Sequence, residues 1–161
     1  SRIRRQRRRR AIADELLLYF DDALFFRDLD ARDERSVILA LGERMRERGI
    51  IDDDYLEGVL EREQISSTAF TEWLAVPHSM RMTAHRTAIA IALYDAPIPW
   101  GEGTVQVVAL VAFSAEGRAT FQTVFEQFVD VFGDRADVQR LLKAATDFPS
   151  FIEELVRLID D

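Results

Sequence analysis

Two apolar runs separated by a short connection occupy residues 87–113, which read TAIAIALYDAPIPWGEGTVQVVALVAF. The runs at 87–94 and 105–113 have the length of strands and are rich in apolar side chains, many of them β-branched. Neither alternates regularly with polar residues, so both are predicted to be buried central strands of a sheet. The intervening residues 95–101 contain two prolines and a glycine, and we expect a connecting loop there.

Helical patterns flank these strands on both sides. Residues 33–48 repeat apolar side chains at three- and four-residue steps and end before Gly49, and residues 52–63 open with an acidic turn that favours a helix start. Residues 11–18 predict a first helix that can begin inside the preceding arginine run, whereas 23–26 fit a strand or a helical turn equally. Further helices are expected over residues 118–132, 135–145 and 151–159. This order predicts a three-layer α/β/α domain with a small sheet at its centre.

The length of 161 residues and the composition fit one globular domain, which we place at residues 11–161. The absence of Cys excludes a disulfide framework, a thiolate metal site and cysteine catalysis, and we expect a cytoplasmic protein with no cofactor and no metal. No run of about 18 apolar residues occurs, and the N-terminal arginine cluster lacks the hydrophobic core and cleavage site of a signal peptide, so no membrane insertion is predicted. Because the chain opens with Ser1 rather than Met, we expect a piece of a longer protein.

Charge is distributed unevenly along the chain. Residues 1–10 contain seven arginines and no acid, whereas residues 11–161 contain 14 basic and 29 acidic side chains. The basic segment is either an interdomain linker, which can be continuous with the first helix, or an arm that binds nucleic acid by neutralising phosphates. We favour the linker, since the acidic body would repel phosphates, and nucleic acid is then expected to be bound only by other domains of the longer protein.

The chain has two histidines, and these are the candidates for chemistry near neutral pH. His78 ends the run LAVPH, in which Pro77 fixes the backbone before the imidazole and takes it out of regular helix. A histidine held in this way can act as a nucleophile, but a structural or surface histidine would fit the pattern equally well. His85 lies in a polar segment that is expected to be an exposed loop.

Residues 60–70, LEREQISSTAF, and residues 74–78, LAVPH, decide between these readings when they are taken together. An Arg-Glu pair, a Thr about six residues later and an Ala-Val-Pro-His sequence follow in an order that resembles the signature of the mannitol/fructose-type enzyme IIA family of the sugar phosphotransferase system. The resemblance covers roughly residues 20–160. It implies a mixed sheet flanked by helices, a phosphohistidine at His78, and Arg62 near the phosphoryl group.

The chemistry of these residue types suits the implied roles. A neutral imidazole attacks phosphorus with its lone pair, and a planar arginine fork neutralises the arriving phosphoryl dianion. Thr68 and backbone amides near Ser79 are expected to donate further hydrogen bonds to the phosphoryl group. Glu63 is expected to make a structural contact rather than to act as a base.

One position departs from the family pattern. Transporter members of the family commonly carry a second active-site histidine, and counting without gaps from Leu110 places it at Phe121. The chain therefore looks more like the IIA-like domains at the C-termini of BglG-family antiterminators and activators that carry phosphotransferase regulation domains. This resemblance implies a regulatory phosphoryl acceptor, phosphorylated by the phosphocarrier HPr or a IIB protein and acting on other domains of its parent regulator. The alternatives are a transport component that relays phosphate from HPr to IIB, and a nucleic-acid-binding module.

Overall fold

A mixed sheet of four strands in the order β1-β3-β4-β2 forms the middle layer of the protein. In this computed structural model, which describes residues 1–161, the strands span Phe25–Arg27 (β1), Leu74–Ala75 (β2), Thr83–Trp100 (β3) and Gly103–Ser114 (β4). The long strands β3 and β4 pair antiparallel at the centre, while β1 runs parallel to β3 and β2 runs parallel to β4. The prediction of two buried central strands is confirmed.

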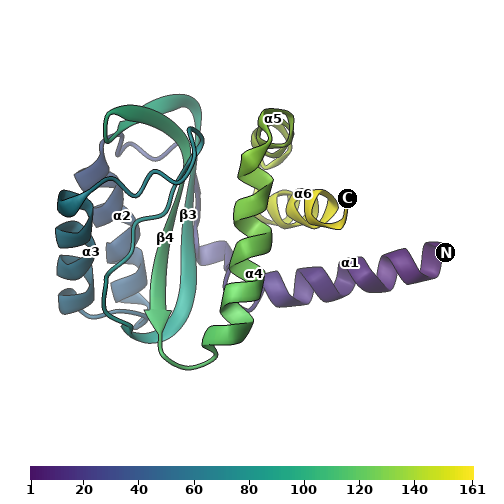
Figure 1. Ribbon diagram of the computed structural model, residues 1–161, viewed down its shortest axis with the longest axis horizontal. Helices are drawn as coiled ribbons and strands as arrows, with labels where there is room; N and C mark the ends of the chain where they lie inside the picture. Colours follow the sequence, from purple (N-terminus) through teal and green to yellow (C-terminus); the bar gives the residue numbers. More distant parts are fainter.

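Helices cover both faces of this sheet (Figure 1). One layer consists of α2 (Glu34–Glu47) and α3 (Asp53–Ile65). The other contains α1 (Arg2–Leu16), α4 (Arg118–Asp130), α5 (Arg135–Ala144) and α6 (Phe148–Asp160). Two short 3₁₀ helices, η1 (Asp22–Leu24) and η2 (Val131–Gly133), complete the helical elements. The three-layer α/β/α architecture is therefore confirmed.

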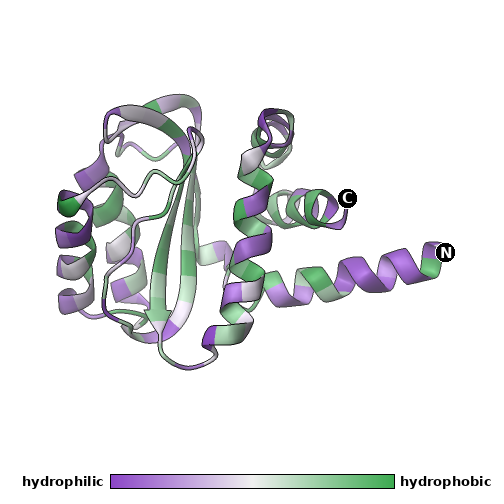
Figure 2. Ribbon diagram, in the orientation of Figure 1, coloured by the Kyte–Doolittle hydropathy of each residue, from purple (hydrophilic) through white to green (hydrophobic).

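The two faces of β3 carry side chains of different size. Ile89, Ile91 and Leu93 enter the core beneath α1 and α4–α6, whereas the alanines at 88, 90 and 92 enter the core beneath α2 and α3. Alanine leaves room on that face, and large side chains of α2, among them Ile38 and Met45, fill it. Figure 2 shows the apolar colour continuing along both central strands, which fits their burial on both sides.

The prediction of a loop at residues 95–101 is wrong, because β3 continues to Trp100 and the turn comes at Gly101 and Glu102. The register shifts between Leu93 and Ile98, so the strand is irregular where the sequence contains Asp95, Ala96 and Pro97. The partner strand β1 ends opposite Leu93, and the prolines beyond it lie at an edge where a missing N–H group costs little. Buried Trp100 then anchors the end of the strand.

The N-terminal segments resolve the two open points of the sequence pattern. The first helix begins at Arg2, within the arginine run, and residues 23–26 divide between η1 and β1. Helix α2 begins after Asp33, whose carboxylate accepts the Ser36 N–H group at 2.9 Å, and the chain leaves it at Gly49, where φ is +72°. None of the helices combines the length and the apolar character that a membrane span requires.

Candidate functional site

The segment that carries His78 runs along one edge of β4. After β2, the chain continues extended through Val76 and Pro77, and the Val111 N–H group donates to the Pro77 carbonyl at 3.0 Å. A parallel bridge then pairs His78 with Val111. Because Pro77 restricts its own φ and disfavours helix in the residue before it, the chain stays extended up to the imidazole. The fold therefore holds His78 beside the C-terminal end of β4.

The orientation of the His78 ring is fixed by one hydrogen bond and one aromatic contact. Its Nδ1 atom lies 2.8 Å from the Val76 carbonyl oxygen, and the ring of Phe113 meets it edge-on with 6.0 Å between centroids. A carbonyl oxygen can only accept a hydrogen bond, so Nδ1 carries the proton. The lone pair of the neutral ring is then on Nε2. The half-buried imidazole thus presents Nε2 as its nucleophilic atom.

His78 lines a cleft of about 310 Å³ between the end of α3, the loop after it and α4. Arg62 is the only permanently charged residue in this cleft. Its guanidinium donates to the Ser66 carbonyl at 2.7 Å, which holds it at the C-terminal end of α3. The whole lining consists of Arg62, Ser67, Thr68, Ala69, Phe70, Val76, His78, Phe113 and Phe125. One cation and one imidazole in a largely apolar cleft suit a dianionic group, since no carboxylate in the lining opposes it.

Glu63 lies beside this cleft and holds the loop that forms one of its walls. Its buried carboxylate accepts hydrogen bonds from the Thr68 N–H group at 2.7 Å, the Thr68 hydroxyl at 2.5 Å and Trp100 Nε1 at 3.1 Å. Three donors compensate the desolvation of this carboxylate. The Thr68 hydroxyl proton is therefore directed at Glu63, and Thr68 forms a wall of the cleft instead of donating into it as expected.

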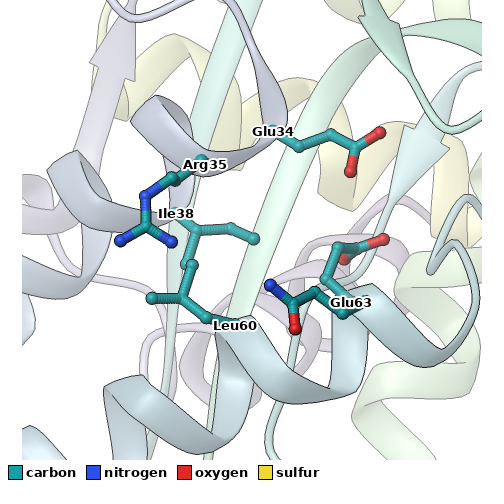
Figure 3. A pocket seen from close by; sticks show the side chains of 6 residues that line it. Glu34, Arg35, Ile38, Leu60 and Glu63 are labelled. Carbon is teal, nitrogen blue, oxygen red and sulfur yellow. The ribbon is translucent and has the colours of Figure 1, made fainter.

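A second hollow, of about 130 Å³, lies between α2 and α3 and reaches Glu63 from the other side (Figure 3). In Figure 3, the side chains of Glu34 and Glu63 lie on one side of this hollow and that of Arg35 lies on the other, beside Ile38 and Leu60. The hollow contains no histidine, and its lining has two carboxylates against one guanidinium. It therefore does not compete with the His78 cleft as a phosphoryl site.

Ser79 lies outside the cleft, contrary to the expectation for this part of the chain. Its hydroxyl accepts the Arg81 N–H group at 3.2 Å. The side chain is buried against Gly58 of α3, where an added Cβ atom would collide with Ser79 Oγ. The Ser79 hydroxyl is thus engaged away from Nε2 of His78.

Phe121 and His85 also have defined surroundings. Phe121 is buried, and its ring contacts Phe113 edge-on at 5.3 Å and stacks on Phe125 at 5.4 Å. It supports the two rings that line the cleft but does not line the cleft itself. His85 is exposed as expected, yet it lies in β3 rather than in a loop, with Nε2 3.0 Å from Asp52 Oδ2.

Three residues that shape the site were not predicted from the sequence. Phe113 and Phe125 come from β4 and α4, far from the signature in the chain, and no local pattern marks them. Ser67 precedes Thr68 in the signature, and its oxygen accepts the Ala69 N–H group at 3.1 Å, which leaves its own proton free to donate into the cleft. No group of three or more His, Cys, Asp or Glu side chains is arranged to hold a metal ion.

The comparisons with known proteins agree with this geometry. The chain matches the family described as phosphoenolpyruvate-dependent sugar phosphotransferase system, EIIA 2, over residues 18–157. It is 30% identical over 125 residues to the "Probable licABCH operon regulator" of Bacillus subtilis (strain 168), and the matched region covers 78% of this chain and 20% of the regulator. It is 26% identical over 132 residues to the mannitol-specific phosphotransferase enzyme IIA component of Halalkalibacterium halodurans, covering 78% of this chain and 88% of that protein.

A solved structure supports the fold. The mannitol enzyme IIA in its complex with phosphorylated mannitol enzyme IIB from Escherichia coli matches with a TM-score of 0.71 at 20% identity, over 84% of this chain and 97% of that chain. The chain spans about a fifth of the length of the Bacillus regulator it matches, and most of the length of the two enzyme IIA proteins. Because the family match extends over residues 18–157, the protein belongs to the EIIA 2 family of the phosphoenolpyruvate-dependent sugar phosphotransferase system.

Proposed function

We propose that this chain is a regulatory enzyme IIA domain, which accepts a phosphoryl group on Nε2 of His78 from phospho-HPr or from a phosphorylated IIB protein. The observation that carries the proposal is the cleft itself. It combines an imidazole whose Nδ1 is occupied by the Val76 carbonyl with a single permanent positive charge, that of Arg62.

The transfer needs little from the protein beyond position and charge. The Nε2 lone pair forms a bond to phosphorus as the bond between phosphorus and the donor side chain breaks, and the donor side chain keeps that electron pair. The Nδ1 proton of His78 stays in its bond to the Val76 carbonyl and stabilises the ring as it becomes positive. Arg62 neutralises the phosphoryl oxygens, for which it must exchange its bond to Ser66 for one to phosphate or use its remaining N–H groups.

Phosphorylation would act as a switch by changing the charge of an otherwise apolar surface. Phe70, at the mouth of the cleft, is 62% exposed, and Phe113 and Phe125 are half-buried. A phosphoryl group adds between one and two negative charges there, which alters how another domain packs on this face. The likeness to a Bacillus operon regulator supports a regulatory role in a longer cytoplasmic protein, with the other domains of that regulator as partners.

The experiment is intact-protein mass spectrometry after incubation with enzyme I, HPr and phosphoenolpyruvate. We expect the wild type to gain one phosphoryl group, and His78→Ala to gain none. His85→Ala is the matched control, because it removes the only other histidine and leaves the cleft intact. Uptake by His78→Ala equal to that of the wild type would overturn the assignment of the acceptor.

Arg62 is tested in the same assay by time course. Removal of one preorganised charge from a phosphoryl site slows transfer by about a hundredfold, and we expect this for Arg62→Ala. Arg62→Lys keeps the charge without the planar fork and should fall between the two. An unchanged rate for Arg62→Ala would exclude Arg62 from the reaction.

A transport role is the second candidate, favoured by the match over 88% of a mannitol-specific enzyme IIA component. Such a domain must pass its phosphoryl group on to a IIB protein. Transfer from the phosphorylated wild type to a mannitol-type IIB within seconds would support this role. Persistence of the phosphohistidine for minutes in the presence of IIB would support regulation.

A further inference from the structure

The N-terminal part of α1 is the most strongly charged surface of the protein, and the proposed phosphoryl site does not use it. We call residues 2–10 the arginine arm. It contains Arg2, Arg4, Arg5, Arg7, Arg8, Arg9 and Arg10 and no acidic residue. The structure places all of them on one helix, and all except half-buried Arg9 are exposed.

The charges of the arginine arm are largely unpaired within the chain. Arg8 and Arg9 bind the carboxylate of Asp160 at the end of α6, and the other five arginines form no ion pair and no side-chain hydrogen bond. Arginines three or four positions apart on a helix are neighbours, and like charges at this spacing destabilise the helix. An anion that binds the arm removes this repulsion, so the helix favours an anionic partner.

The arrangement of the charges restricts what that partner can be. At 3.6 residues per turn, seven arginines within nine positions point to all sides of the helix. A flat acidic protein surface meets only one side of a helix. The major groove of B-form DNA admits an α-helix and has phosphates along both walls, so it meets a helix on several sides at once. Arginine also matches phosphate oxygens in a bidentate manner that lysine does not.

The arm also projects away from the acidic body. Figure 1 shows α1 passing beyond the end of α6, and the bonds of Arg8 and Arg9 to Asp160 mark the place where it leaves the body. Residues 2–7 then extend roughly 9 Å further at about 1.5 Å per residue. Arg2, at the far end, is therefore about one Debye length of 0.1 M salt from the body, and the repulsion of a polyanion by the acidic body decreases along the arm.

We propose that the arginine arm binds duplex DNA by lying in the major groove and neutralising phosphates on both walls, although the sequence alone favoured a linker. All seven charged side chains of the arm are arginines, so phosphate contacts provide most of the affinity. This binding is independent of phosphoryl acceptance at His78.

The test is fluorescence anisotropy of a labelled 20-base-pair DNA duplex with the whole 161-residue chain at several salt concentrations. The arm variant replaces Arg2, Arg4, Arg7 and Arg10 by Gln, which preserves helix propensity. The matched control replaces four exposed arginines of the body, Arg35, Arg86, Arg118 and Arg140, by Gln and so removes the same charge. We expect at least a tenfold loss of affinity at about 50 mM salt for the arm variant, and less than threefold for the control.

The salt dependence and two further probes decide the outcome. We expect the slope of log affinity against log salt to fall by about 0.9 for each phosphate that the arm variant no longer neutralises. Equal losses in the two variants, or no binding by the wild type at 50 mM salt, would overturn the proposal. A-form RNA duplex bound as tightly as DNA would overturn the groove assignment, because its major groove is too narrow for a helix. Salt-sensitive dimerisation of the wild type, abolished in the arm variant, would identify the acidic body of a second copy as the partner instead.

Discussion

Tyr55 connects two backbone groups of β4 beside the candidate site through one hydroxyl. The hydroxyl donates to the Val111 carbonyl at 2.7 Å and accepts the Phe113 N–H group at 2.9 Å. Phe113 packs its ring on His78, and Val111 pairs with His78 in a parallel bridge. Burial raises the pKa of the Tyr55 hydroxyl, so it remains a protonated donor at neutral pH. Tyr55 is therefore a positioning residue for His78.

Tyr55→Phe should slow phosphoryl acceptance more than its effect on stability explains. Loss of the hydroxyl leaves one N–H group and one carbonyl without this partner in a buried place, which costs about 1–3 kcal/mol. The freed segment no longer fixes the imidazole, and we expect acceptance about tenfold slower. The matched control is Tyr94→Phe, because the Tyr94 hydroxyl donates to Ala31 at 2.7 Å and burial raises its pKa to about 12. Its loss should lower stability by about 1 kcal/mol without slowing acceptance. Equal rates for the two variants would restrict Tyr55 to a role in stability.

Residues differ in how far the sequence alone reveals them. The proximity of His78 and Arg62 could be predicted, because a short signature contains both and the fold brings them to one cleft. The direction of the Thr68 hydroxyl could not, since it depends on the position of Glu63 on the preceding helix. The contacts of Phe113 and Phe125 depend on the packing of β4 and α4 against the His78 segment, which no local pattern encodes.

The segment from Asp95 to Gly101 shows the same limit at the scale of elements. Its prolines and glycine favour a loop locally, whereas pairing with β4 makes residues 98–100 part of a strand. Ladder hydrogen bonds and the burial of Trp100 outweigh the local preference. The periodic helices and the apolar central strands were predictable because their signals lie within one element.

Gly101→Ala should disturb the site through the turn between β3 and β4. Gly101 has φ of +59°, and an added Cβ would lie 2.7 Å from Ser67 Oγ and 2.8 Å from Ser67 Cβ, in the loop that lines the cleft. Gly49→Ala is the matched control, since its φ is +72° and nothing lies within 4 Å of the new Cβ. Thermal unfolding should show a loss of about 1–2 kcal/mol from the left-handed backbone in both variants. Only Gly101→Ala should also slow phosphoryl acceptance, by severalfold. An unaltered rate would mean that Ser67 moves without consequence for the cleft.

At the scale of the whole molecule, Asp160 joins the first helix to the last. Hydrogen bonds from Arg8 and Arg9 lower the pKa of its carboxyl to about 2, and only 3% of its side chain is exposed beneath these arginines. Helices α1 and α6 also share apolar contacts, among them those of buried Leu16 and Leu155 in one core. The ion pairs thus add a pH-dependent component to a docking that is otherwise apolar.

Asp160→Asn should lower stability over a defined range of pH. The pKa of this carboxyl is depressed in the folded protein from an unfolded value of about 3.9, so its contribution is fully present above that value. It is lost as the pH falls through about 2, where the wild-type carboxyl becomes protonated and no longer differs in charge from Asn. We therefore expect the urea midpoint of the variant to lie below that of the wild type at pH 5–7. The two midpoints should converge as the pH approaches 2. Asp30→Asn is the control, since Asp30 is exposed and makes no ion pair or hydrogen bond, and its midpoint should follow that of the wild type throughout. A separation that persisted at pH 2 would show that Asp160 stabilises the helix pair by packing and not by charge.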